Sequence, residues 1–116
     1  LRLAAISEGI KKIITEYDPD EAAIEETFVN NNARSSLALG QARGAAILTL
    51  AQNKLSVAEY AANLVKKTVT GNGHAEKIQI AAMVKMLLPG SSADSADATD
   101  ALAVAICHSS FANKKF

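Results

Sequence analysis

Cysteine, tryptophan and proline are scarce or absent in this chain. A single cysteine, Cys107, excludes a disulfide within the chain and suits a reducing compartment. Its neighbours Val104 and Ile106 are apolar, so we expect a small buried hydrophobe and not a reactive thiol. Because there is no Trp and apolar residues are mostly aliphatic, the core is expected to consist of small and branched side chains.

Long apolar runs and an excess of one charge are also missing. No segment reaches the roughly 18 consecutive apolar residues of a membrane span, and no signal peptide is recognisable. Net charge is zero, which does not favour binding to phosphates over the whole surface. The charge is uneven, however, since five lysines and two glutamates lie between residues 54 and 88. Such unevenness fits lysines that contact phosphate, although a solvated surface also accounts for it.

Apolar periodicity predicts an alternation of helices and strands. Apolar residues at helical spacing predict a helix over residues 1–17, and Asp18-Pro19-Asp20 ends it. A short apolar run predicts a buried strand at 21–25. Ser35 or Ser36 is expected to cap a helix reaching about Gln52. The remaining elements are a strand at 57–61, a turn or helix at 66–70, and helices at about 75–88 and 96–109.

This order predicts an α/β fold that forms a single domain over residues 1–116. Two strands make a poor sheet, and the chain begins at Leu1 within an expected helix, so we expect it to be part of a longer protein whose first strands precede it. Gly40 and Gly44 weaken the helix that contains them, which suggests close approach to another backbone. That neighbour is either the sheet or a second copy of the protein.

Three carboxylates are placed where chemistry is plausible. Glu25 ends a predicted buried strand, where an α/β sheet opens to its ligand. Asp97 and Asp100 lie at i and i+3 in the first turn of the last helix and share a face. Carboxylates are the usual ligands of Mg²⁺, and paired metal ions promote phosphodiester hydrolysis. Spacing alone equally allows a solvated strand end and a helix N-terminus stabilised by acidic residues.

Three motifs together resemble the RuvC family of Holliday-junction resolvases. Residues 23–28 (AIEETF) and 32–44 (NARSSLALGQARG) resemble its strand-end glutamate and the following helix. Residues 65–79 (VKKTVTGNGHAEKIQ) resemble its lysine-bearing segment, and residues 96–108 (ADATDALAVAICH) its closing helix. The resemblance implies a ribonuclease-H-like α/β fold with a mixed sheet flanked by helices, truncated at its N-terminus.

The resemblance also implies roles for individual residues. Glu25, Asp97 and Asp100 match three of the family's four metal-binding catalytic carboxylates, which implies two Mg²⁺ ions, with Mn²⁺ as a substitute. Lys66 and Lys77 match lysines that contact DNA near the cut or assist the transition state. Phe28 matches an aromatic residue that stacks on an unpaired base. Solvated lysines and a core phenylalanine are the ordinary alternatives.

The implied activity is metal-dependent cutting of four-way junction DNA by a homodimer. The family's partners are a junction-binding protein and a branch-migration helicase in the bacterial cytoplasm. The fourth family carboxylate, on a first strand, has no match, so we expect the 116-residue chain alone to be inactive. The competing interpretations are a related nuclease acting on structured RNA and a non-catalytic DNA-binding module. His74 and His108 are predicted to be non-catalytic.

Overall fold

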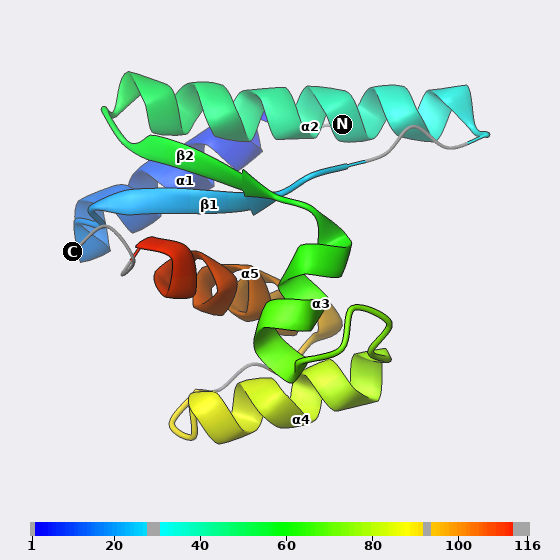
Figure 1. The fold of residues 1–116 in the computed structure, drawn as a ribbon. Helices are drawn as coiled ribbons and strands as arrows, with labels where there is room; N and C mark the ends of the chain where they lie inside the picture. The colour runs from blue at the N-terminus through cyan, green and yellow to red at the C-terminus, as the bar shows by residue number, and fades with distance from the viewer. Residues whose placement is uncertain (1, 28–30, 92–93, 113–116) are drawn as a thin grey trace. The chain divides into compact units, whose positions relative to one another are not determined.

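In the computed structural model, residues 2–27, 31–91 and 94–112 are described, and they alternate helices with strands (Figure 1). The strands β1 (Glu21–Glu25) and β2 (Ser56–Tyr60) pair in one two-stranded sheet. They run parallel because the helix between them returns the chain to the same end of the sheet. The predicted α/β class and the bounds of the first strand are confirmed, and the second strand begins and ends one residue earlier than predicted.

The described chain divides into two compact units, which split the strands between them. The first unit holds residues 1–22 and 27–57, and the second holds residues 23–26 and 58–116. The prediction of a single domain over 1–116 therefore stays a prediction. Every residue discussed below as part of the candidate site belongs to the second unit.

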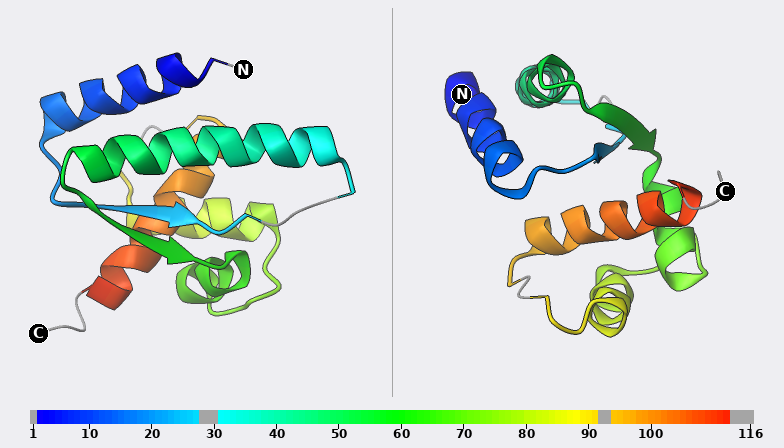
Figure 2. Two further views of the ribbon diagram at one scale, coloured as in Figure 1. Left: turned by 90° about the horizontal axis from the view of Figure 1, so that it is seen from above. Right: turned by 90° about the vertical axis from the view of Figure 1, so that its left-hand side faces the viewer.

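The first unit is built on two helices that lie side by side, α1 (Leu3–Tyr17) and α2 (Ala33–Gln52) (Figure 2). The hydroxyl of Thr49, 2% exposed, lies 2.7 Å from the Ser7 hydroxyl and fixes the two helices to each other. Asn32 caps α2, its side chain accepting the Ser35 N–H at 3.1 Å. The predicted caps Ser35 and Ser36 are wrong, because both already lie inside the helix.

The two glycines of α2 are not used for packing inside the described chain. A Cβ placed on Gly40 or Gly44 would meet nothing within 4 Å. The apolar residues of the same helix are also exposed in part, with Leu37 64% and Leu48 58% accessible. Close approach of these glycines to the sheet is therefore not observed. Of the two predicted neighbours, a second copy of the protein is the one that remains.

The second unit contains the buried core, formed where α3 (Ala62–Thr70), α4 (Lys77–Leu87) and α5 (Ala96–Ala112) pack together. Its buried apolar residues are mostly small or branched, as the composition predicts: Val65, Val69, Ala75, Ile80, Val84, Ala103, Val104 and Cys107. Cys107 is fully buried, which confirms its predicted role as a small hydrophobe.

Two details of these helices differ from the sequence-based prediction. The helix α3 begins at Ala62, four residues before the predicted start, and ends at Thr70; Gly71 is its C-cap, and a φ of +84° suits glycine there. On α5 the helical spacing of Leu102, Ala105 and Ile106 predicts an inward face, but Ala105 is exposed, whereas Ala103 and Cys107 are buried. An alanine-rich helix gives a weak periodic signal, since small residues are tolerated on either face.

None of the helices in the described ranges has the length and apolarity needed to cross a membrane.

Truncation of the core should destabilise the second unit. We expect Val84→Ala to lower the free energy of unfolding by about 2 kcal/mol, because Val84 is 2% exposed and the lost methyl groups leave a cavity. Met86→Ala on the same helix is the matched control, since Met86 is 73% exposed and should change stability by no more than about 0.5 kcal/mol. Urea titration measures both values, and equal losses would contradict the assignment of the core.

Candidate metal and nucleic-acid site

One pocket of the second unit collects most of the predicted site residues. It encloses about 440 Å³ and lies among the end of β1, the helix α3, the start of α4 and the helix α5. Four predicted residues from four chain segments line it, namely Glu25, Lys66, Lys77 and Asp100. The apolar floor consists mostly of small side chains: Ala62, Val65, Ala75, Ile80 and Ala103.

Local structure explains how the two carboxylates reach this pocket. Glu25 is the last residue of β1, and the next residue, Glu26, donates its backbone N–H to the Tyr60 carbonyl at 2.8 Å. This bond continues the pairing with β2 just beyond Glu25. Asp100 lies near the start of α5, where Ser95 caps the helix by accepting the Ala98 N–H at 3.1 Å. Both carboxylates belong to exposed residues, so both are accessible to a ligand from solvent.

The two lysines line the pocket from two consecutive helices, of which α3 ends before the loop at residues 71–76 and α4 begins after it. Lys66 lies in the middle of α3 and is half-buried, and Lys77 is the first residue of α4. The sequence analysis missed Glu76, which also lines the pocket. Its side chain accepts the Gln79 N–H, and its own N–H donates to Gln79 Oε1 at 2.8 Å. The pattern Glu-x-x-Gln at a helix start was the available signal, and it indicates a structural role for Glu76.

The carboxylates of the pocket suit a divalent cation, because one or two carboxylates are enough for a Mg²⁺ ion that keeps water among its ligands. Carboxylate oxygens are the ligands that Mg²⁺ prefers, and Glu25 and Asp100 fit such an ion as two of its ligands. Asp97 is exposed and does not line the pocket, although it lies one turn before Asp100 on α5. Across the described ranges no three His, Cys, Asp or Glu side chains gather as a metal site. The predicted three-carboxylate cage therefore stays a prediction.

The remaining predicted residues lie elsewhere. Phe28 falls outside the described residues, so its stacking role stays a prediction. His74 is exposed in the loop before α4, where its backbone N–H donates to Asn72 Oδ1 at 2.9 Å. His108 is half-buried towards the end of α5, and its Nδ1 shares a 2.6 Å hydrogen bond with the Tyr60 hydroxyl. Neither histidine lines the pocket.

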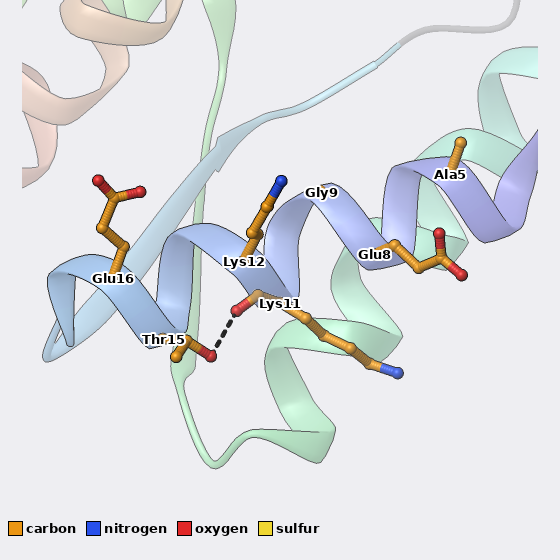
Figure 3. A pocket seen from close by; sticks show the side chains of 7 residues that line it. All are labelled: Ala5, Glu8, Gly9, Lys11, Lys12, Thr15 and Glu16. Carbon is orange, nitrogen blue, oxygen red and sulfur yellow. Dashed lines mark hydrogen bonds between the residues drawn. The ribbon is translucent and has the colours of Figure 1, made fainter.

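A second hollow follows the outer surface of α1 and, unlike the first pocket, is formed by one helix. It is lined by residues of this single helix, including Glu8, Lys12 and Glu16 at intervals of one turn (Figure 3). Every lining residue is exposed, and the hydrogen bond drawn there joins the Thr15 hydroxyl to the Lys11 carbonyl at 3.0 Å. Alternating charges on an exposed helix are typical of a solvated face.

Comparison with known proteins places the chain in a family and identifies its fold. The family model described as "Crossover junction endodeoxyribonuclease RuvC" matches residues 1–108. Proteins of that name from Methylorubrum extorquens (strain PA1) and Beijerinckia indica are 61% and 64% identical over 110 and 107 residues. These alignments cover 95% and 92% of this chain but 58% and 61% of the relatives. The chain thus spans about three fifths of the length of these curated relatives.

Solved structures show the same fold. "T. thermophilus RuvC in complex with Holliday junction substrate" superimposes with a TM-score of 0.90 and 28% identity, covering 98% of this chain and 70% of that one. "Thermus thermophilus RuvC structure" gives 0.87 and 27%, over 98% and 69%. Because these RuvC structures have a ribonuclease-H-like fold, the predicted fold class is confirmed.

Proposed function

Because the chain belongs to the RuvC family of crossover junction endodeoxyribonucleases, we propose that it is the greater part of a nuclease that resolves four-way DNA junctions. The observation that carries the proposal is the shared pocket. Two acidic and two basic side chains that the family resemblance predicts as site residues line one cavity although they lie up to 75 residues apart, between Glu25 and Asp100. The reaction proposed is metal-dependent phosphodiester hydrolysis that leaves paired, symmetric nicks.

The proposed cofactor is a pair of Mg²⁺ ions, with Mn²⁺ as a substitute. When bound, such ions supply the Lewis acidity that activates a water and stabilises the leaving oxygen. Glu25 and Asp100 hold an ion through their carboxylate oxygens, and Asp97 is the third proposed ligand of this chain. Lys66 and Lys77 offset the negative charge that develops on the scissile phosphate. The half-buried position of Lys66 strengthens this effect, because partial exclusion of water reduces screening.

The substrate is tested by direct comparison of nucleic acids. The complete protein is incubated with Mg²⁺ and a synthetic four-way junction, a linear duplex or a structured RNA. The proposal predicts symmetric nicks in the junction and little cutting of the other two. Preferential cleavage of RNA would favour the related ribonuclease, and junction binding without cutting would favour a non-catalytic DNA-binding module.

We also propose that these 116 residues alone do not cut DNA. Three carboxylates line the pocket, and that of Glu76 is engaged in capping α4; within the described residues no three His, Cys, Asp or Glu side chains gather as a metal site. The fourth carboxylate of the family has no match in the sequence. Junction cleavage by the purified 116-residue chain, tested beside the complete protein, would contradict this proposal.

The proposed assembly is a homodimer that contacts itself through α2. A two-fold dimer matches the near two-fold symmetry of a four-way junction. The support lies in the exposed apolar residues Leu37 and Leu48 and in the open space beside Gly40 and Gly44. A junction-binding protein and a branch-migration helicase are the further proposed partners, and the cytoplasm is the proposed place of action.

A charged substitution on α2 tests this interface. Leu37→Glu should weaken dimerisation by about 2 kcal/mol, since the interface would bury an unpaired carboxylate. Leu39→Glu is the matched control, because Leu39 is 46% exposed and lies on roughly the opposite side of the helix. Light scattering over a dilution series gives both dimerisation constants. An unchanged constant for Leu37→Glu would exclude this face as the interface.

A further inference from the structure

A contact outside the pocket joins β2, the strand paired with β1, to α5, the helix that carries Asp100. Tyr60 is the last residue of β2, and its hydroxyl lies 2.6 Å from Nδ1 of His108 on α5. The Tyr60 ring also lies against the rings of His108 and Phe111, with centroids 5.6 Å and 5.7 Å away. His108 and Phe111 are three residues apart and so share one face of α5. Tyr60 is thus fixed to α5 by one hydrogen bond and two ring contacts.

The backbone of the same tyrosine holds the strand end that carries Glu25. The Tyr60 carbonyl accepts the N–H of Glu26 at 2.8 Å, immediately after Glu25. One residue therefore binds the end of β1 through its backbone and α5 through its side chain. All of these residues belong to the second unit, so the connection is internal to one compact body.

We infer that Tyr60 and His108 are positioning residues that hold the helix carrying Asp100 in register with the strand end carrying Glu25. This inference rests on the proposed function, because it assigns the pair a task only if the two carboxylates share a ligand. Asp100 lies eight residues before His108, about 12 Å along a rigid helix, so a slide of α5 at His108 displaces Asp100 equally. Metal–ligand distances tolerate about 0.2 Å, which makes even a small slide costly.

The packing beside the pocket explains why a polar contact is needed for this task. The residues there include Ala62, Ala75 and Ala103, whose short side chains interdigitate little. Apolar burial is also non-directional, and it resists sliding less than a hydrogen bond of defined length. The Tyr60–His108 hydrogen bond restrains α5 from sliding along its own axis, at the half-buried His108.

The test uses the complete protein and measures Mn²⁺ binding by calorimetry beside junction cleavage. Tyr60→Phe keeps the ring and removes the hydroxyl, and His108→Ala removes the imidazole to which that hydroxyl is hydrogen-bonded. Each should weaken Mn²⁺ binding and lower kcat by about 10-fold, the usual effect of losing an outer support of a metal site, with KM for the junction unchanged. The double variant should lose no more than either single variant, because both remove the same bond.

Matched variants separate positioning from general stability. His108→Asn can keep a polar atom near the place of Nδ1 and should restore most of the lost affinity. Tyr17→Phe and His74→Asn make the same kinds of change at exposed residues and should bind Mn²⁺ as the wild type does. Thermal unfolding is recorded for every variant. The inference is overturned if Mn²⁺ affinity is unchanged in Tyr60→Phe and His108→Ala, or if it follows thermal stability in all variants including His108→Asn.

The same experiment distinguishes a failure of the proposed function from a failure of the positioning role. A wild-type protein that binds Mn²⁺ but cuts RNA in place of the junction contradicts the proposed substrate, while the variants still decide the positioning role. A wild-type protein that binds no Mn²⁺ contradicts the proposed function and the positioning role together.

Discussion

Replacing Glu25 with Gln in the complete protein is expected to lower the rate of junction cleavage by about 10³-fold and to leave junction affinity unchanged. Glutamine has nearly the same shape but no negative charge, so it cannot serve as an anionic ligand for a divalent ion. Asp100→Asn should behave in the same way, because both carboxylates line one pocket. Single-turnover cleavage and gel-shift titration measure the rate and the affinity separately.

The neighbouring residue provides a close control for this experiment. Glu26→Gln makes the identical change one position along the chain, and Glu26 is not among the residues lining the pocket. Its backbone bond to Tyr60 is unaffected by the side chain. Full activity in Glu25→Gln, or equal losses in both variants, would mean that the pocket carboxylates are not the metal ligands.

Replacing Lys66 with Met should give the second large effect, a fall in kcat of about 100-fold. Lys66 lines the same pocket as Glu25 and Asp100 and is half-buried as a residue, so we expect its charge to be only partly screened by water. Methionine keeps most of the side-chain volume and removes the charge. The salt dependence of junction binding should also become shallower by about one unit of slope if Lys66 contacts a phosphate.

Lys67→Met is the matched control for this variant. Lys67 follows directly on the same helix but is exposed and does not line the pocket. We expect it to retain kcat, and any change should be confined to binding at low salt. If Lys67→Met and Lys66→Met lose activity equally, the lysines act through the general charge of α3 and not from the pocket.

The strand end bearing Glu25 could be predicted because a short apolar run is bounded by charged residues on both sides. The predicted strand and β1 have the same bounds, residues 21–25. The start of α3 was missed because Ala62 and its neighbours show little periodicity. The strand predicted at 57–61 also included Ala61, which is in fact the N-cap of α3. The cap of α2 was also misplaced. Asn and Ser are both favourable N-cap residues, so the local sequence does not distinguish Asn32 from Ser35, and the helix begins after Asn32.

The site was predictable in its chemistry and less so in its geometry. The spacing of Asp97 and Asp100 places them one turn apart, but sequence alone does not say which of them the pocket includes. The contact between Tyr60 and His108 joins residues 48 positions apart, and nothing in their local sequence indicates it. Long-range side-chain contacts of this kind depend on how α5 packs, which a single sequence does not encode in any local pattern.

The central claim, that Glu25 and Asp100 hold a divalent cation in one pocket, has a direct test. Crystals of the complete protein are grown with Mn²⁺, and anomalous scattering locates the metal. The account predicts an anomalous peak within about 2.5 Å of oxygens from both carboxylates. A map with no peak at the pocket, or with Mn²⁺ bound by other residues, would contradict it.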